Sequence, residues 1–176
     1  MNINKVIDNI VEDIGTELLD EYDRNFERKG FFNQSWKPTK HHNSRGSLLN
    51  RTGTLRRSIN RQKSKRSLRF TSSVPYAKLM NEGGTIIVTA KMKKFFWAMY
   101  QQNVTKAKKG SKKQAEKLSA EALKWKRMAL MKIGTKMKVE QRQFLGWHPQ
   151  VDAIIKNNAD FHIKELNKQI LKKLKQ

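Results

Sequence analysis

The sequence predicts an α+β fold in which a mainly antiparallel sheet of about four strands is packed by long N- and C-terminal helices. The helices are predicted because apolar residues recur every three or four positions near both ends of the chain. The sheet is predicted because segments between residues 55 and 139 alternate apolar with polar residues or are rich in β-branched ones. The 176 residues suit a single domain, with residues 91–130 as an inserted basic helical hairpin.

The N-terminal segment has the clearest helical pattern. Its apolar residues form one stripe: Ile3, Val6, Ile7, Ile10, Val11, Ile14, Leu18, Tyr22 and Phe26. The opposite face is acidic and carries Asp8, Glu12, Asp13, Asp20 and Glu27. This acidic face either docks the basic region of a neighbouring copy or is simply hydrated.

A turn at Thr52 and Gly53 precedes the first predicted strand. The threonine hydroxyl is available to cap the next element, which begins at Leu55 and continues toward Ile59. Residues 68–74 then alternate apolar and polar side chains, which is the pattern of a half-buried strand.

A short helix and two more strands come next in the chain. Residues 76–80 form the helix, and Gly83 and Gly84 terminate it before a strand over residues 85–89. Residues 131–139 alternate strictly and carry the longest strand pattern of the chain. We expect all these strands to join one sheet.

Residues 91–130 predict two helices that form a hairpin projecting from the sheet. Their apolar stripes consist of Met92, Phe95, Phe96, Met99 and Tyr100 in the first helix, and of Ala115, Leu118, Ala122, Trp125 and Ala129 in the second. Residues 106–113 are expected to form a basic, flexible connector. Aromatic side chains beside lysines can stack on nucleic-acid bases, but stripes at helical spacing are far more often core, and we interpret these as packing.

Residues 30–50 show no regular pattern. A loop of this length inside a domain is typically functional or becomes ordered on assembly. Trp36 either anchors this loop against the core or inserts into a partner, and large aromatic side chains mostly supply buried area, so we expect the anchor.

Residues 142–146 are expected to link the last strand to the C-terminal helix. Phe144 and Leu145 should enter the core where the chain turns from sheet to helix. Arg142 should pair with a carboxylate such as Glu140 or Glu82, or point into an interface. The C-terminal helix starts at Pro149 and places its apolar residues along one side: Val151, Ile154, Ile155, Phe161, Leu166, Ile170 and Leu174.

The net charge of +23 is distributed unevenly. Residues 1–28 hold eight of the fifteen acidic residues against three bases, whereas residues 37–69 hold eleven bases and no acid. Residues 103–143 hold thirteen bases and three acids. Such a surface attracts nucleic acid or an acidic protein face, or else keeps the chain soluble.

The sequence carries no pattern of catalytic or metal-binding residues. Its carboxylates are scattered after Glu27, and Gly83-Gly84 lacks the lysine and hydroxyl residue of a phosphate-binding loop. The histidines lack the spacing of a metal motif: His41, His42, His148 and His162. We therefore expect no enzyme and no cofactor. The absence of cysteine and of a long apolar run predicts a protein of the reducing cytoplasm, without a membrane segment.

Two separated blocks of the sequence resemble the virion morphogenesis or tail completion family of tailed bacteriophages. The matching residues are Leu49, Thr52, Gly53, Leu55, Ser58, Ile59, Val74, Tyr76, Ala77, Gly83 and Gly84, and then, far downstream, Arg142, Phe144, Leu145 and Gly146. The chain departs from the family at Met80 or Asn81, where a histidine or glutamine is common, and at Gln143, where a proline is common. Residues 91–130 look like an insertion relative to shorter members.

The resemblance implies a structural role in the virion. It implies a tail completion or terminator protein at the head–tail neck or tail end, present in the host cytoplasm during assembly. Copies would form a ring that joins the capsid connector to the tail and lets DNA pass, with portal, adaptor and tail proteins as partners. The alternative from charge alone is a nonspecific nucleic-acid-binding protein, although no recognition motif is present.

The candidate contact residues for DNA or a neighbouring subunit are basic. They are Arg51, Arg56, Arg57, Arg61, Lys63, Lys65, Arg66, Lys108, Lys109, Lys112, Lys113 and Arg142. Because the tract over residues 37–69 and the connector near residue 110 are so polar, both are expected to become ordered only on a partner.

Overall fold

The computed structural model describes residues 3–39, 46–109 and 111–175. Six helices are described in these residues: α1 (Ile3–Arg28), α2 (Thr54–Arg57), α3 (Ala77–Glu82), α4 (Ala90–Lys109), α5 (Lys112–Leu130) and α6 (Pro149–Leu174). The strands described there are β1 (Gly30–Phe31), β2 (Gln34–Ser35), β3 (Ile59–Ser64), β4 (Ser67–Ser72), β5 (Gly84–Ile87) and β6 (Lys136–Val139). The fold is mixed α and β, as the sequence predicts, and none of the described helices is long and apolar enough to cross a bilayer.

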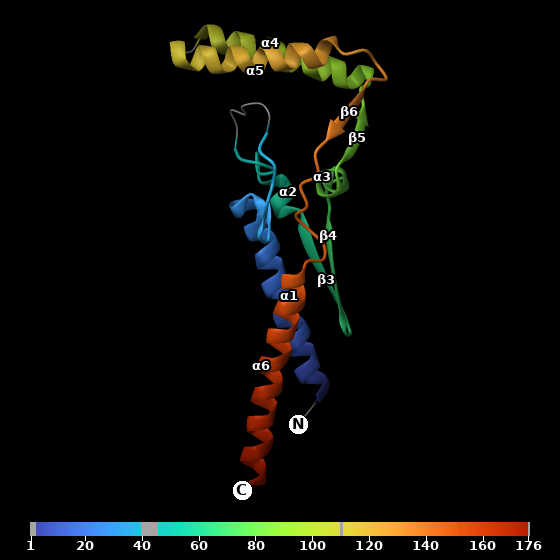
Figure 1. Ribbon diagram of the computed structural model, residues 1–176, viewed down its shortest axis with the longest axis vertical. Coiled ribbons are helices and arrows are strands. Elements are labelled where there is room, and N and C mark those ends of the chain that lie inside the picture. Colours follow the sequence, from blue (N-terminus) through green and yellow to red (C-terminus); the bar gives the residue numbers. More distant parts are fainter. Residues whose placement is uncertain (1–2, 40–45, 110, 176) are drawn as a thin grey trace.

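The strands do not form the expected single sheet. β3 pairs with β4, β5 pairs with β6 and β1 pairs with β2, all antiparallel, so the structure has three separate two-stranded sheets. α3 lies between β4 and β5 in the chain, and β5 then leads away from the body toward the helical hairpin (Figure 1). The strands predicted near residues 59, 70, 88 and 137 are therefore present, but their pairing differs from the prediction.

The last strand is shorter than its alternating pattern predicts. β6 covers only Lys136–Val139, whereas residues 131–135 form an irregular turn. Gly134 adopts a positive φ of 91°, and its N–H donates to the Val88 carbonyl at 2.9 Å. This backbone conformation is incompatible with an extended strand, so the alternating pattern predicted a strand that is longer than β6.

α1 and α6 lie side by side and antiparallel, and both chain ends are at the same end of the molecule (Figure 1). The C-terminal part of the predicted α1 stripe enters the core, with Ile14, Leu18, Tyr22 and Phe26 buried, whereas Ile3 at its start is 64% exposed. α6 begins at Pro149 as predicted, and His148 caps it by accepting a hydrogen bond from the Gln150 N–H at Nδ1. Of the predicted α6 stripe, however, only Val151 is buried.

The body has two hydrophobic clusters. Buried residues of α1, of the segment after it and of α6 form the first: Ile14, Leu18, Tyr22, Phe31, Phe32 and Val151. The second cluster joins distant parts of the chain. Its buried members are Phe26, Trp36, Leu55, Ala77 and Phe144. Trp36 anchors its loop as expected, because its ring is buried and its Nε1 donates to the Gln143 carbonyl at 2.7 Å. Phe144 enters the core as predicted, with 0% of its surface exposed.

α4 and α5 form the predicted helical hairpin across the far end of the molecule, joined to the body by β5 and β6 (Figure 1). Phe96, Trp125 and Ala129 are its buried core. The predicted flexible connector is wrong for most of its length, because α4 continues through Lys109 and α5 begins at Lys112. Most of the lysines between the two apolar stripes extend these helices instead of forming a loop.

Candidate functional site

The two motif blocks of the sequence meet at one place, which we call the junction. Asn81, at the end of α3, accepts hydrogen bonds at Oδ1 from the N–H groups of Phe144 and Leu145 at 2.9 and 3.0 Å. The Arg142 N–H donates to the Met80 carbonyl at 2.9 Å. Segments more than 60 residues apart in sequence are therefore tied together by three hydrogen bonds to backbone N–H groups.

Glycines at the junction permit this close approach. Gly83 has a φ of 73°, and a Cβ atom built there would lie 3.0 Å from the backbone nitrogen of Gln141. A side chain at this position would therefore strain the backbone and press against the second block. Gly84 comes next with a φ of 150° and starts β5, so the glycine pair ends the helix as predicted.

Asn25 supports the junction from α1. Its side chain is 0% exposed; Nδ2 donates to the Phe144 carbonyl at 3.3 Å, and Oδ1 accepts from the Phe32 N–H at 2.8 Å. Tyr22, one turn earlier, donates its hydroxyl to the Gly146 carbonyl at 2.9 Å, and burial raises the pKa of this phenol. Asn25 was not predicted from the sequence; the available signal was a polar residue between buried positions of the helical stripe.

A groove of about 840 Å³ opens beside the junction, and we call it the motif groove. Its lining includes several residues of both motif blocks: Leu49, Thr52, Leu55, Tyr76 and Arg142. Arg51 and Lys29 also line it, and no carboxylate is among its described lining residues. The motif groove is therefore cationic with an apolar floor, which suits an acidic protein segment or a phosphate backbone.

Arg142 does not make the expected carboxylate pair. Its Nη2 donates to the Lys37 carbonyl at 3.2 Å, and within the described structure no ion pair joins it to Glu82 or Glu140. Its Nε is buried without a hydrogen-bond partner in the described residues. Half-buried in the wall of the motif groove, the guanidinium thus retains hydrogen-bonding capacity.

Thr52 and Gly53 form the predicted turn, but not with the predicted cap. The Thr52 hydroxyl lies 2.8 Å from that of Thr54 and does not cap α2, whose N-cap is Gly53 with a φ of 72°. Arg57 donates from Nη2 to the Thr52 carbonyl at 2.8 Å and packs against Gly53. Arg57 therefore helps to shape the turn as well as lying at the surface.

Three of the predicted contact residues bind the acidic face of α1 in the same chain. Arg56 pairs with Asp23 and Glu27, which raises the Arg56 pKa. Arg61 pairs with Glu12, and Lys63 reaches the same carboxylate at 3.3 Å. Cations of the same chain thus cover part of the acidic face, for which the sequence left open either docking of a neighbouring copy or simple hydration.

We expected the tract over residues 37–69 to become ordered only on a partner. Its described part instead contains α2, β3 and β4 in the single chain. Ion pairs of Arg56 and Arg61 with carboxylates of α1 hold this polar tract against the helix. Lys65 and Arg66 are exposed at the turn between β3 and β4, and His41 and His42 lie outside the described residues.

The remaining predicted contact residues are at the free end of the helical hairpin. Lys108 and Lys109 end α4, Lys112 begins α5, and all three are exposed. Lys113 belongs to the same first turn of α5. The structure therefore does not bring the predicted basic residues together at one site. Some bind α1, some line the motif groove and some lie at the free end of the hairpin.

Acid should weaken the contact between α1 and the β3–β4 hairpin. Hydrogen bonds from Arg61 and then Lys63 hold the pKa of Glu12 below its ordinary value of 4.5. A carboxyl group with a lowered folded-state pKa stabilises the fold above its ordinary pKa, and this stabilisation is lost as pH falls through the folded-state value. We expect the free energy of unfolding to decrease below pH 4.5, and to decrease less in a Glu12→Gln variant, as measured by urea denaturation across a pH series.

The matched control for this prediction is Asp160→Asn, which removes an exposed carboxylate on α6. This variant should retain the pH dependence of the wild-type protein. Identical pH dependence in the wild-type protein and Glu12→Gln would contradict the role given to the Glu12 ion pairs.

Comparison of the chain with protein-family models, curated proteins and solved structures found no match. Among the residues that the structure describes, no group of three or more His, Cys, Asp or Glu side chains is placed to hold a metal ion. His148 stacks on Phe32 as the cap of α6, and His162 Nε2 lies 2.6 Å from Asp13 Oδ2. Both described histidines thus have contacts that account for their positions.

Proposed function

We propose that this chain is a structural component of a tailed-bacteriophage virion, placed at the head–tail neck or at the tail end as a tail completion or terminator protein. The observation that carries the proposal is the junction. The two sequence blocks that resemble this family are far apart in the chain, yet matching residues of both, Leu55, Ala77 and Phe144, pack in one cluster beside the motif groove. Asn81, which is not a matching residue, ties the two blocks by hydrogen bonds.

In this proposal, copies of the chain form a ring that joins the capsid connector to the tail and lets DNA pass. In a ring, one surface of each copy binds a different surface of the next copy. The last copy must then bind the first, because otherwise the same contact builds an open fibre. The motif groove is the surface on which an acidic segment of a portal, adaptor or tail protein would dock, because its charge is positive and its floor apolar.

An Arg142→Ala variant tests this function. The side chain lies in the wall of the motif groove, and only one hydrogen bond, to the Lys37 carbonyl, is made by its guanidinium in the described structure. We expect the variant to fold, because its backbone bond to Met80 remains, yet to yield tailless capsids or unjoined tails in a complementation assay read by electron microscopy.

Arg69→Ala is the control, because Arg69 is exposed on β4 and does not line the motif groove. It should give a normal yield of infectious particles. A normal yield from Arg142→Ala would overturn the role of the motif groove, and absence of the wild-type chain from purified virions would overturn the proposed function.

The alternative function is nonspecific nucleic-acid binding, which the exposed lysines at the hairpin end favour. Binding of this kind weakens steeply with salt, because released counterions drive it. Retardation of DNA by the isolated chain, lost on Lys108→Glu/Lys109→Glu substitution, would support this alternative, whereas recovery of the chain in virions without DNA retardation would exclude it.

A further inference from the structure

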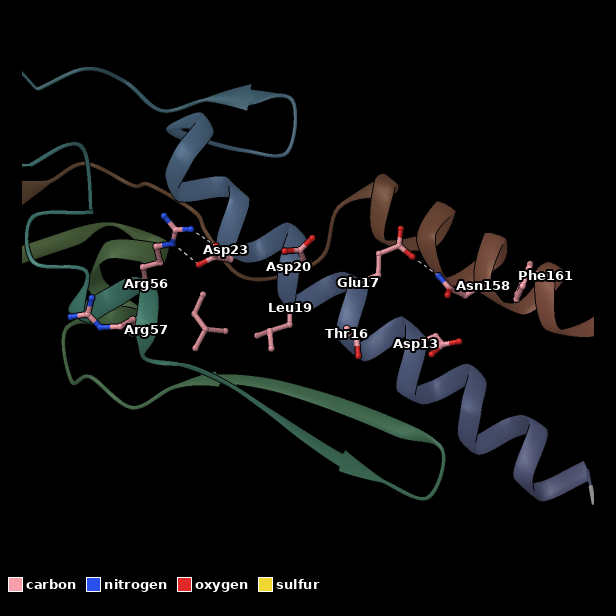
Figure 2. Close-up of a pocket in the computed structure, with 11 residues that line it drawn as sticks. Asp13, Thr16, Glu17, Leu19, Asp20, Asp23, Arg56, Arg57, Asn158 and Phe161 are labelled. Carbon is pink, nitrogen blue, oxygen red and sulfur yellow. Dashed lines mark hydrogen bonds and ion pairs between the residues drawn. The ribbon is translucent and has the colours of Figure 1, made fainter.

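A second groove, of about 770 Å³, lies between α1, α2 and α6, and we call it the acidic groove (Figure 2). Four acidic side chains from successive turns of α1 line it and outnumber the two basic ones, Arg56 and Arg57 of α2; the acidic residues are Asp13, Glu17, Asp20 and Asp23. Leu19, Ile59 and Phe161 supply apolar surface, and Phe161 is 62% exposed. An apolar floor with carboxylates on its rim suits a basic amphipathic helix.

The charge of this rim is only partly neutralised within the chain. Asp23 pairs with Arg56, but Glu17 accepts from Nδ2 of Asn158, a neutral amide, at 2.7 Å (Figure 2). Asp20 pairs with Arg24 at the surface, where both side chains are about half exposed. Surface pairs of this kind contribute little and are readily exchanged, so Glu17 and Asp20 remain able to attract a cation.

The complementary surface is on α5, and we call it the basic ridge. It consists of Leu123, Lys126, Arg127 and Leu130, which are spaced so that they share one face of the helix. Leu123 and Leu130 are 55% and 63% exposed, and the two cations between them are exposed as well. The opposite face of α5 packs against α4 through Trp125 and Ala129, so the basic ridge points away from the hairpin core.

We propose that the basic ridge of one copy docks in the acidic groove of a second copy. Lys126 and Arg127 would meet Glu17 and Asp20, while the two leucines cover the apolar floor. The segment Ala90–Leu130 carries twelve bases and two acids, whereas α1 carries eight acids and three bases, so the wider charges of the two surfaces are also complementary.

The contact has to join different copies. In one chain the hairpin lies across the far end of the molecule, away from the part of α1 that lines the acidic groove (Figure 1). Since the two surfaces differ, the contact is heterologous and repeats from copy to copy. It supplies the subunit contact of the ring, and in that respect it rests on the proposed function; the pairwise contact itself needs no virion.

Charge reversal on each surface tests the contact. Glu17→Lys/Asp20→Lys reverses the rim, and Lys126→Glu/Arg127→Glu reverses the basic ridge; all four side chains are exposed, so both variants should fold. Sedimentation velocity on the full chain, at concentrations from micromolar to submillimolar and at low and high salt, should show self-association that each variant weakens by at least about tenfold. Thermal unfolding verifies the fold of each variant.

Mixing the two variants gives the sharpest result. The intact ridge of one variant fits the intact groove of the other, and the two reversed surfaces are again complementary, so the mixture should associate although neither variant does alone. The controls change the same charge elsewhere: Asp8→Lys/Asp160→Lys, and Lys106→Glu/Lys109→Glu at the far end of the hairpin. Both controls should associate like the wild-type chain.

Three results would overturn the proposal. They are a wild-type chain that stays monomeric at every concentration and salt, association that both reversed variants retain, and variants that do not rescue one another. If the chain stays monomeric and the ridge variant loses DNA retardation, the ridge is a nucleic-acid surface instead. Rescue on mixing, with no chain found in virions, would leave this contact standing and remove the proposed function.

Discussion

Replacing Phe144 with Ala should lower the free energy of unfolding by about 3–5 kcal/mol, the usual cost of removing a buried aromatic side chain. The ring is 0% exposed, and its centroid lies 5.4 Å from that of Phe26. Asn81 holds the Phe144 N–H and Asn25 holds its carbonyl, so the Phe144 backbone itself cannot shift readily to close the cavity. A loss of this size is a large share of a domain's stability, so little soluble protein should remain.

Urea denaturation followed by tryptophan fluorescence would measure this loss, since Trp36 belongs to the same cluster. Phe161→Ala is the control, because it removes the same ring from a position that is 62% exposed. It should change stability by no more than about 1 kcal/mol. Equal losses for the two variants would contradict the place of Phe144 in the core.

Replacing Asn25 with Leu should have the second-largest effect. The branched shape and the number of heavy atoms are kept, but the Phe32 N–H and the Phe144 carbonyl both lose their side-chain partner. Each buried backbone group left unpaired costs about 1–3 kcal/mol, so the two together cost about 2–6 kcal/mol. The bond to the Phe144 carbonyl is the longer one at 3.3 Å, so we expect the loss to lie in the lower half of that range. The effect comes from hydrogen bonding and not from a cavity, which separates it from that of Phe144→Ala.

Hydrogen exchange provides a second readout for this variant, because the Phe32 amide should exchange much faster once Asn25 is gone. The control is Asn9→Leu, at an exposed position of the same helix, which should leave stability and exchange nearly unchanged. A stable Asn25→Leu protein with a protected Phe32 amide would show that these hydrogen bonds matter little.

Elements with a strong local pattern were predictable from the sequence. The spacing of apolar residues predicted α1, and alternation predicted β4, because a helix or strand must turn one face to a core. Pairing was not predictable in the same way. Neither the β-branched run that identifies β5 nor the alternation that identifies β6 carries information about the partner strand, and residues 131–135 alternate although Gly134 makes a turn there.

The junction and the ion pairs show a second limit. Phe144 was predictable as core because it sits between a strand and a proline, but Asn25 and Asn81 look like ordinary helical polar residues until the fold brings them to a backbone. The pairing of Arg61 with Glu12 joins residues 49 positions apart. Charge composition shows that both signs are present, but only the packing of β3 on α1 decides which side chains meet.

Two backbone hydrogen bonds close the base of the α4–α5 hairpin. The Val88 N–H donates to the Thr135 carbonyl, and the Gly134 N–H donates to the Val88 carbonyl, both at 2.9 Å. The two ends of the segment that carries α4 and α5 are thus held as closely as the ends of a tight turn. We therefore expect that a short turn can replace the α4–α5 hairpin while both hydrophobic clusters of the body stay intact.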